Sequence, residues 1–423
     1  MSTFTHSVYL DADKCKGCIN CIKRCPTGAI RVRGGKAHII KEFCIDCGEC
    51  VRVCPHHAKR TRYDSLSCLS EYQYKVALPA PSFYAQFNNV NDTGIILKAL
   101  LKLGFDDVFE VAAAAEMVSE LSRAYIAAHP EGRPYISTAC PSIVRLIRVR
   151  FPGLIDRMLP IITPADLAAS IAVKEAMRKT GLARKDIGIF FISPCPAKVT
   201  AVEDPLGIEK SEIDRVLAVK KVYTAILPLM DHADAGDTEL KRAGRIGISW
   251  GLTGGEVGGL LTDSYIAADG IENVINVLED LEDSKIHDLD FLELNACTGG
   301  CVGGVLQVEN PYVAKTKLTL LRKYMPIAGS HLDGTVPEDA YWTHEVEFEP
   351  VFRLGANTRE SMEMMRKIDE ITELLPGLDC GSCGAPSCRA LAEDVVRGVA
   401  NERDCIHLLK KYLHQISSDL NAL

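Results

Sequence analysis

The stretch LDFLELNACTGGCVGG, residues 289–304, joins a short apolar run to two cysteines and two Gly-Gly pairs. Apolar runs that end in such turns are typical of strands in a parallel α/β sheet, whose ligands gather at the carboxyl ends of the strands. Cys297 and Cys301 stand four residues apart, whereas zinc and dithiol motifs favour C-x2-C, and no histidine stands nearby. The stretch therefore predicts an α/β sheet with a thiolate site of another kind at its edge.

Four further apolar runs end in Gly, Ser or Pro turns and lead into helical stretches, which again predicts parallel sheets. Two of these turns add Cys140 and Cys195 to the predicted edge. Between the runs, a helix is expected to begin after Thr163 and to end at Gly181. The turn at 251–259 has no G-x-G-x-x-G and no Walker lysine, so a nucleotide loop is not favoured. The runs are residues 74–82, 133–142, 187–198 and 244–255.

The composition narrows the class of protein. The chain has 423 residues, 47% of them hydrophobic, and no apolar run approaches the roughly 18 residues of a membrane span. Its net charge of −8 gives no support to nucleic-acid binding. The first residues show no secretory signal, so 17 cysteines point to metal or redox chemistry before disulfides, in a cytoplasmic protein.

The first 55 residues contain a repeat, CKGCINCIKRCP at 15–26 and CIDCGECVRVCP at 44–55. This C-x2-C-x2-C-x3-C-P run is that of two-cluster bacterial ferredoxins, in which the fourth cysteine ligates the other cluster. Zinc would leave surplus thiolates, because each zinc takes four ligands. We therefore assign one 4Fe–4S cluster to Cys15, Cys18, Cys21 and Cys54, and a second to Cys44, Cys47, Cys50 and Cys25.

The tail changes character after an expected β segment at 345–354 and an expected helix at 357–375. It carries four cysteines, enough for one more 4Fe–4S cluster, with a structural zinc as the alternative. These are Cys380, Cys383, Cys388 and Cys405. With four cysteines in the α/β core, 16 of the 17 have a predicted metal role, and only Cys68 has none. The expected domains are 1–62, 63–355 and 356–423.

Three core segments resemble the signature motifs of FeFe-hydrogenases. They are TACPS at 138–142, SPCPAK at 193–198 and NACTGGCVGG at 295–304, preceded by APS at 80–82. The resemblance covers residues 1 to about 310 and implies an α/β H-cluster domain of parallel sheets. An α+β two-cluster ferredoxin domain would precede it, and a small helical iron–sulfur domain would follow.

The resemblance also implies cofactors and ligands. In that family four cysteines hold a 4Fe–4S cube, and the last also bridges to a diiron unit that carries CO, cyanide and an azadithiolate. Carried over, the cube ligands are Cys140, Cys195, Cys297 and Cys301, with Cys301 as the bridge. Lys198 would bond one cyanide, and Ala80, Pro81 and Ser82 would contact the other. Ala139, Ser193, Pro194 and Asn295 complete the expected cofactor contacts, and the motif glycines would keep side chains away from the cluster.

The proton path departs from the family pattern. Ala139 stands where efficient members carry a proton-passing cysteine, and Ser193 and Asn295 stand at two methionine positions. Ser122 and Tyr125 align with two relay glutamates. Together with the added tail cluster, these changes resemble the sensory branches of the family. No PAS-like or kinase segment is visible, so a separate signalling protein is the expected output partner.

Glu293 and Glu256 are the candidate substitutes for the missing relay. Each follows a predicted strand near the cluster segments, although either would also serve as an ordinary surface or N-cap carboxylate. A partly buried glutamate has a raised pKa, which suits proton transfer near neutral pH. We therefore expect these two carboxylates to form a slower proton route.

The sequence leaves three functions to compare. The first is a slow hydrogenase that interconverts H2 with protons and electrons, uses a redox partner such as ferredoxin, serves H2 or redox sensing, and depends on maturation proteins. The second is a hydrogenase-like iron–sulfur assembly or scaffold protein without the diiron unit. The third is an electron-transfer subunit. Two complete ferredoxin runs and Lys198 favour the first.

Overall fold

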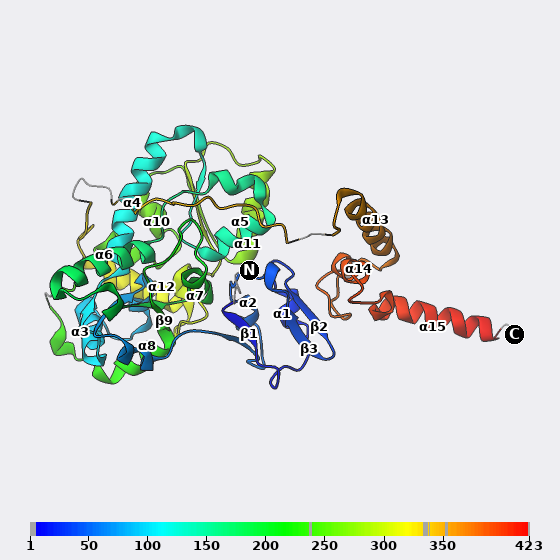
Figure 1. The fold of residues 1–423 in the computed structure, drawn as a ribbon, viewed down its shortest axis with the longest axis horizontal. Coiled ribbons are helices and arrows are strands. Elements are labelled where there is room, and N and C mark those ends of the chain that lie inside the picture. Colours follow the sequence, from blue (N-terminus) through cyan, green and yellow to red (C-terminus); the bar gives the residue numbers. More distant parts are fainter. Residues whose placement is uncertain (1–5, 237–238, 333–336, 338, 352–353, 422–423) are drawn as a thin grey trace. The chain divides into compact units, whose positions relative to one another are not determined.

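The computed structural model describes residues 6–421 except 237–238, 333–336, 338 and 352–353 (Figure 1). Its contacts divide the chain into two compact units. The core unit comprises the described parts of residues 1–7, 45–48 and 62–348. The cluster unit comprises those of 8–44, 49–61 and 349–423, which joins the ferredoxin-like segment to the tail. The three-domain division expected from the sequence stays a proposal.

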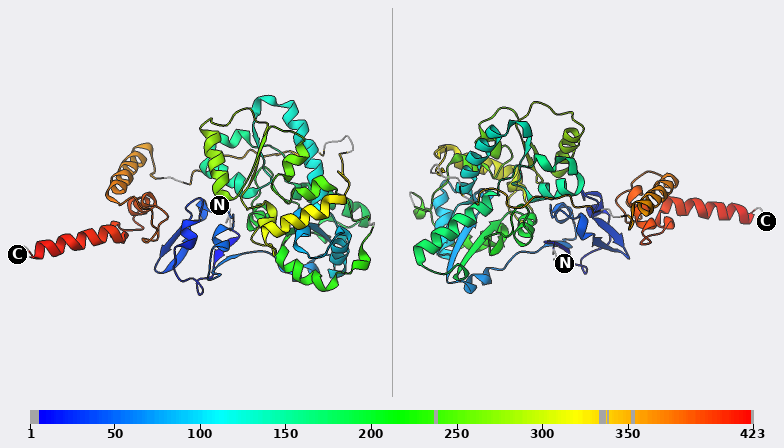
Figure 2. Two further views of the ribbon diagram at one scale, coloured as in Figure 1. Left: turned by 180° about the vertical axis from the view of Figure 1, so that it is seen from behind. Right: turned by 45° about the horizontal axis from the view of Figure 1, so that its top comes forward.

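The core unit contains a four-stranded sheet in the order β6-β5-β8-β9, parallel throughout. Its strands are β5 (Tyr74–Pro79), β6 (Asp107–Val108), β8 (Ile187–Ser193) and β9 (Arg215–Ala218). The seven residues of β8 are all buried, as expected of a parallel strand covered on both faces. The covering helices are α3 (Thr93–Leu103), α6 (Pro164–Thr180) and α8 (Val219–Ile226), and a further helix, α4 (Val111–Ala128), lies against α6 (Figures 1 and 2).

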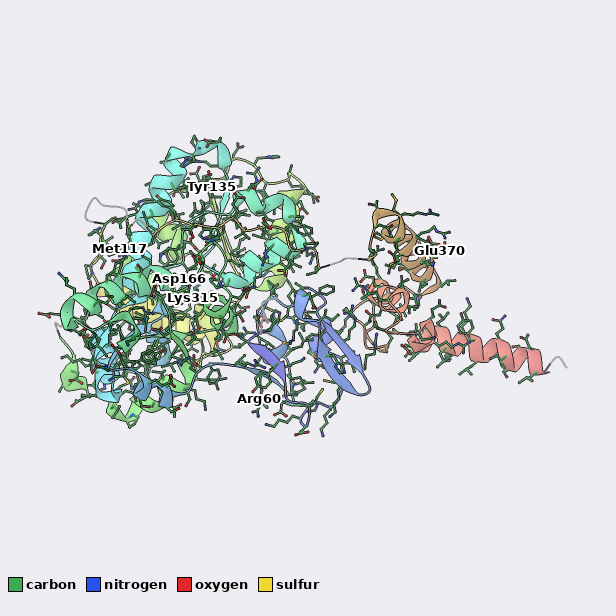
Figure 3. The ribbon with its side chains drawn as sticks, in the orientation of Figure 1. Arg60, Met117, Tyr135, Asp166, Lys315 and Glu370 are labelled. Carbon is green, nitrogen blue, oxygen red and sulfur yellow. The ribbon has the colours of Figure 1, made fainter. Side chains whose placement is uncertain are left out.

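A second parallel sheet has the order β10-β11-β7. Its strands are β7 (Tyr135–Ile136), β10 (Tyr265–Asp269) and β11 (Phe291–Asn295), and Leu292 pairs with Ile136. Figure 3 labels Tyr135, which lies on the short edge strand β7. Apolar residues of α5 (Pro141–Arg150) and α11 (Ile271–Glu282) form one core with this sheet. The parallel α/β core expected from the sequence is thus confirmed.

The other helices of the core unit are α7 (Pro196–Glu203), α9 (Arg245–Ser249), α10 (Gly255–Leu260) and α12 (Pro311–Leu321). The expected cap of α6 is confirmed, because the Thr163 hydroxyl accepts a hydrogen bond from the Asp166 amide and Gly181 ends the helix in the left-handed region. Asp166 is labelled in Figure 3.

The expected strand at 244–255 is wrong, because this stretch forms α9 and the start of α10. The cause is the buried carboxylate of Glu116 on α4, which accepts hydrogen bonds from the amides of Gly244 and Gly247 at 2.9 and 3.0 Å. Gly247 packs so closely that a Cβ there would lie 2.0 Å from the Ala112 carbonyl oxygen. Glu256 therefore lies in the first turn of α10 and not at the end of a strand.

The cluster unit contains two antiparallel pairs of strands, β1 with β4 and β2 with β3. Its elements are β1 (Val8–Leu10), α1 (Asn20–Lys23), β2 (Ile30–Arg33), β3 (Lys36–Ile39), α2 (Glu49–Arg52) and β4 (Lys59–Thr61). Its tail adds α13 (Thr358–Leu374), α14 (Cys388–Val396) and α15 (Ile406–Asn421). Helix α13, with Glu370 labelled in Figure 3, confirms the helix expected at 357–375.

The β segment expected at 345–354 is wrong for its described residues, 345–351 and 354, which form no strand. None of their backbone groups is paired in a ladder with a strand of the described chain, so their alternating pattern has no sheet to join. Within the described ranges, no helix combines the length and apolar character needed to cross a membrane.

Candidate metal centre

A buried pocket in the core unit gathers most of the predicted cofactor contacts. It encloses about 560 Å³ of empty space, part of which is open to solvent. Its lining includes Cys301 and the predicted contacts Ala80, Pro81, Ala139, Pro194, Lys198, Asn295, Glu256 and Glu293. Val111, Ala115, Pro164, Ala165, Phe191 and Trp250 complete the wall with largely apolar surface.

The carboxyl ends of parallel strands supply this lining. Ala80 directly follows β5, Ala139 follows β7, and Pro194 follows β8. Asn295 is the last residue of β11. Side chains at these ends converge because parallel strands finish at one edge of their sheet. The structure thus brings together residues that are up to 215 positions apart in the sequence.

Three of the four predicted cube cysteines lie close enough to influence one another. Burial and the charges of Cys301 and Cys140 raise the pKa of Cys195 to about 12, and Lys198 opposes the shift. Burial likewise raises the pKa of Cys301 to about 11, with Lys198 opposing and Cys140 adding to the shift. Without a cation these thiols would stay protonated, so the site is suited to thiolates only when a metal group neutralises them.

Each cysteine is placed by the start of a helix or by a glycine turn. Cys140 and Cys195 are the N-cap residues of α5 and α7, and a proline follows each. Cys301 begins a short 3₁₀ turn, Cys301–Gly303, and Cys297 precedes it in the loop after β11. Cys140, Cys195 and Cys301 lie near one another, and Cys297 stands four residues before Cys301 in the same loop region. A 4Fe–4S cube requires four thiolates, so these residue types fit that group.

The glycines between and after these cysteines are required by the protein backbone itself. A Cβ at Gly300 would lie 2.6 Å from the Thr253 amide nitrogen, and one at Gly303 would lie 2.1 Å from the Thr298 carbonyl oxygen. A Cβ at Gly304 would lie 2.2 Å from the Pro194 carbonyl oxygen. The family resemblance predicts that these glycines keep side chains away from a bulky cofactor. The contacts show that the cysteine loop also packs directly on the loops after β8 and before α10.

Lys198 connects two of the cysteine loops. Its Nζ donates a hydrogen bond to the Ala139 carbonyl oxygen at 3.0 Å, and the side chain is half-buried at the pocket wall. This places a positive charge beside Cys195 and Cys301, whose thiolate forms it stabilises.

Glu256 and Glu293 form a buried carboxylate pair in the same pocket. They are 5% and 2% exposed, respectively. Glu293 accepts hydrogen bonds from the amides of Gly254 and Val257 at 2.9 and 3.0 Å and from the Asn295 side-chain amide at 3.0 Å. The hydroxyl of Ser137 donates to Glu256 at 2.6 Å. Glu293 thus has several donors, whereas Glu256 has one.

Hydrogen bonds oppose protonation of the two carboxyls to different degrees. Burial, and then the charge of Glu293, raise the pKa of Glu256 to about 8, against the opposing effects of Ser137 and Lys198. Burial also raises the pKa of Glu293, but the amides of Val257 and Gly254 and the side chain of Asn295 oppose that shift. Two interacting carboxyls titrate as a pair, and burial makes this pair bind protons at higher pH than exposed carboxyls do.

Two predicted cofactor contacts lie behind the pocket wall. Ser82 is buried, and its hydroxyl oxygen accepts a hydrogen bond from the Gln307 side chain at 2.7 Å. Ser193 is buried at the end of β8, where its hydroxyl donates to the Cys195 carbonyl oxygen at 3.0 Å. These contacts hold the loops that carry the site, and direct cofactor contact by either serine stays a prediction.

Sequence reasoning missed Ser137 and Trp250. Ser137 precedes Cys140 by three residues, and its hydroxyl is the hydrogen-bond donor to Glu256. Trp250 closes part of the pocket wall, and its indole donates to Ser119 at 3.0 Å. The tryptophan was visible as one of only two in the chain, but its position depended on α9, which was expected to be a strand.

Helix α4 carries the two positions that align with the relay glutamates. Ser122 is fully buried, and Tyr125 stacks on His129 with ring centroids 4.2 Å apart. The buried Glu116 on the same helix binds the amides of Gly244, Gly247, Gly329 and Ser330, all within 3.0 Å. Its carboxylate has a structural role, because backbone donors occupy both oxygens.

The first predicted ferredoxin-like set and the four tail cysteines lie in the cluster unit. Burial raises the pKa of Cys21, and the nearby charges of Cys18, Cys54 and Cys15 raise it further, which places this predicted set of four together. The four tail cysteines line one cavity of about 290 Å³. Of the other predicted cubane set, Cys44, Cys50 and Cys25 belong to this unit, whereas Cys47 belongs to the core unit. That assignment stays a prediction.

Three family models match separate parts of the chain. A model described as the C-terminal domain of the iron-only hydrogenase large subunit matches residues 73–257 and 255–305, more than half of the chain. A 4Fe-4S dicluster domain matches residues 7–55, and a model described as an Fe-S cluster matches 375–407. The three matches contain every cysteine with a predicted metal role, and Cys68 lies outside them.

Individual relatives are distant. Iron hydrogenase 1 of Clostridium pasteurianum is 24% identical over 266 residues, which are 51% of this chain and 45% of the relative. The NADP-reducing hydrogenase subunit HndD of Solidesulfovibrio fructosivorans is 24% identical over 264 residues, or 50% and 45%. The chain spans about half the length of the curated relatives it matches. A variant of FeFe-hydrogenase HydA1 from Chlamydomonas reinhardtii is 15% identical, with a TM-score of 0.47, over 60% of this chain and 87% of that one.

Proposed function

This chain belongs to the iron-only hydrogenase large-subunit family, and on that basis we propose that it is a slow hydrogenase used in H2 or redox sensing. It would interconvert H2 with protons and electrons. One observation carries the proposal: Cys301, Lys198 and the proton-sharing pair Glu256 and Glu293 line the same buried pocket. A metal ligand, a fixed cation and an ionisable pair are the protein groups that such chemistry needs.

The proposed cofactor has two parts. Cys140, Cys195, Cys297 and Cys301 would hold a 4Fe–4S cube, and Cys301 would also hold the diiron unit with its CO, cyanide and azadithiolate ligands. When bound, this group supplies the redox chemistry of H2, which no side chain can supply. Three further 4Fe–4S clusters are proposed, two at the ferredoxin-like cysteines and one in the tail.

The protein's own part in the pocket is to bind, orient and exclude water. The Lys198 ammonium would stabilise a cyanide by a charge-assisted hydrogen bond, given its position beside Cys195 and Cys301. Ala80 and Pro81 also line the pocket. Phe191 and Trp250 supply apolar surface, which keeps bulk water away and strengthens every charge interaction inside.

The carboxylate pair would hold and move the proton. Burial and the charge of Glu293 raise the pKa of Glu256, while the backbone and amide donors of Glu293 oppose the rise in the pKa of Glu293 itself. A carboxyl with a pKa of about 8 exchanges protons readily near the pH of a cell. With Ala139 in place of a thiol at the pocket wall, we assign the shared proton of this pair to the route that a thiol would otherwise serve.

The proposed partners follow from the redox chemistry. A ferredoxin-type carrier would exchange electrons with the cluster unit, maturation proteins would deliver the diiron unit, and a separate signalling protein would receive the output. The proposed compartment is the cytoplasm.

Infrared spectroscopy of the protein matured with the diiron unit tests the proposal. Bands of metal-bound CO and cyanide are expected, together with measurable H2 oxidation. Matured protein without such bands, but with intact 4Fe–4S clusters, would contradict the hydrogenase and support the assembly or scaffold alternative. Lys198→Gln should weaken retention of the bands, whereas Lys185→Gln, on an exposed turn before β8, should not.

A further inference from the structure

The tail of the cluster unit extends the edge of a strand in the ferredoxin-like segment. The Val32 amide on β2 donates a hydrogen bond to the Gly384 carbonyl oxygen at 2.8 Å. Gly384 adopts a φ of +80°, and a Cβ there would lie 2.0 Å from the Val32 carbonyl oxygen. Only glycine fits this contact. The loop between Cys383 and Cys388 is therefore built to lie along β2.

A buried ion cluster fastens the same contact. Asp394 on α14 accepts hydrogen bonds from Arg31 at 2.7 Å and from Arg33 at 2.8 Å, both through Oδ2. The side chains of Arg31 and Asp394 are only 8% and 7% exposed. The second guanidinium branch of Arg33 donates to the Cys383 carbonyl oxygen at 2.8 Å. Arg33 thus connects Asp394 directly to a predicted cluster ligand of the tail.

The loop around Cys380 meets the helix that carries Cys21. The Lys23 side chain donates a hydrogen bond to the carbonyl oxygen of Asp379, the residue before Cys380. A Cβ at Gly381 would lie 3.3 Å from Cδ of Lys23 and 3.9 Å from Cβ of Ile19. Ile19 stands between Cys18 and Cys21, so the ligand loop of the tail packs on the ligand loop of the first ferredoxin-like set.

We propose that these contacts make the tail cluster an electron contact for the cluster held by Cys15, Cys18, Cys21 and Cys54. A reduced tail cluster would lose one electron and the oxidised ferredoxin-like cluster would gain it, with no bond made or broken and no proton moved. A low-potential one-electron carrier protein would reduce the tail cluster in turn. Asp394 is a positioning residue in this arrangement, because it holds the two ligand loops together through Arg31 and Arg33.

The proposed electron contact lies within the cluster unit and requires no diiron unit. It can therefore be tested on the full chain with its 4Fe–4S clusters reconstituted and no H2 activity. Reduced 4Fe–4S clusters are paramagnetic, so two that lie close together broaden each other's electron paramagnetic resonance signals and relax faster. Failure of the hydrogenase proposal would leave this measurement unchanged.

The first comparison is between the native chain and Asp394→Asn, both reduced with dithionite. The expected result is an unchanged iron content and a decrease in the spin–spin broadening, because the two ferredoxin-like clusters still broaden each other but the tail cluster no longer contributes. Asp369→Asn is the matched control, because it breaks an exposed ion pair with Arg389 inside the tail and leaves the β2 contact intact. Broadening in Asp394→Asn equal to that of the native chain would overturn the positioning role of this residue.

The second comparison keeps the inference testable if Asp394→Asn does not fold. Cys405→Ser removes a tail ligand and leaves the first ferredoxin-like set complete. The proposal expects the remaining signals to sharpen and to saturate at lower microwave power than in the native chain. Identical saturation of the native chain and Cys405→Ser would mean that the tail cluster lies too far away for exchange, and the proposal would be wrong.

Discussion

Glu256, whose pKa is raised by burial, has its pKa raised further by the charge of its neighbour Glu293, which lies in the same buried pocket. Backbone amides and the Asn295 side chain donate hydrogen bonds to Glu293, and the Ser137 hydroxyl donates to Glu256. This relationship leads to the first two predictions.

Glu256→Gln keeps the hydrogen bond from Ser137 possible but removes the titratable proton. We expect H2 turnover of the matured protein to fall about tenfold or more, a loss worth at least about 1.4 kcal/mol, while iron content and CO bands stay unchanged. Glu293→Ala should give a similar loss. Glu279→Gln on the exposed face of α11 is the control. Full activity in both pocket variants would contradict the proton route.

The metal-free protein should lose stability as the pH rises through the range of Glu256. Its pKa is raised from 4.5 in the unfolded chain to about 8 in the fold, so the folded state binds more protons between these values. The contribution of Glu256 to the free energy of unfolding is fully present below about pH 4.5 and falls as the pH approaches 8. Glu256→Gln should flatten this fall and gain roughly 1–3 kcal/mol at pH 8.5. Urea denaturation measures the free energy of unfolding of both proteins at pH 5.5 and 8.5. A difference between the two proteins that is the same at both pH values would contradict the prediction.

Cys405→Ser should remove one cluster's worth of iron, about four atoms, because a cubane requires four protein ligands. The CO and cyanide bands should remain. Cys68→Ser is a natural control, since Cys68 donates its thiol hydrogen bond to Ser65 and lies outside all three family matches. Iron and zinc analysis of both variants decides the matter, and zinc in the native tail would favour the structural-metal alternative.

Asn295→Met should shift the CO bands of the matured protein. The amide stands at the pocket wall and also donates to Glu293, so its loss changes both the polarity around the metal group and the charge of the carboxylate pair. We expect altered redox potentials as well. Asn310→Met, at the exposed start of α12, serves as the comparison for general effects of the substitution. An infrared spectrum identical to that of the native protein would argue against this role.

Gly304→Ala should destabilise the protein by about 2 kcal/mol or more, because its Cβ would overlap the Pro194 carbonyl oxygen and one of the two loops would have to move. Gly258→Ala in α10 meets no atom within 4 Å and should instead stabilise the helix by roughly 0.5–1 kcal/mol. Thermal unfolding of the two variants and the native protein measures whether stability falls in Gly304→Ala and rises in Gly258→Ala. Equal stabilities would show that the cysteine loop has more freedom than its contacts indicate.

The sequence predicted the parts of the molecule that depend on local spacing. Cysteine runs, the cap at Thr163 and the buried strand β8 each follow from neighbours in the chain. The strand predicted around Gly247 was wrong, because the helical form of this stretch depends on Glu116. That residue is 131 positions away, and its carboxylate accepts a hydrogen bond from the Gly247 amide. No local pattern carries that information.

The same limit applies to the pocket. Glu256 and Glu293 were chosen for their nearness to the cluster motifs, and the structure places them together although one of them lies on a helix and not after a strand. The donor Ser137 was not foreseen, because it is 119 positions from Glu256. How strongly hydrogen bonds oppose protonation of each carboxyl depends on donors that only the folded chain reveals.

Cys140 and Cys195 each stand at the start of a helix, α5 and α7, and the Lys198 amide in the first turn of α7 bonds the thiol of Cys195. The aligned peptide dipoles of such a helix are equivalent to about half a positive charge at its first turn. Two of them give the site a cationic potential that belongs to the backbone. This potential depends on no titratable side chain, so it persists as long as the two helices are folded.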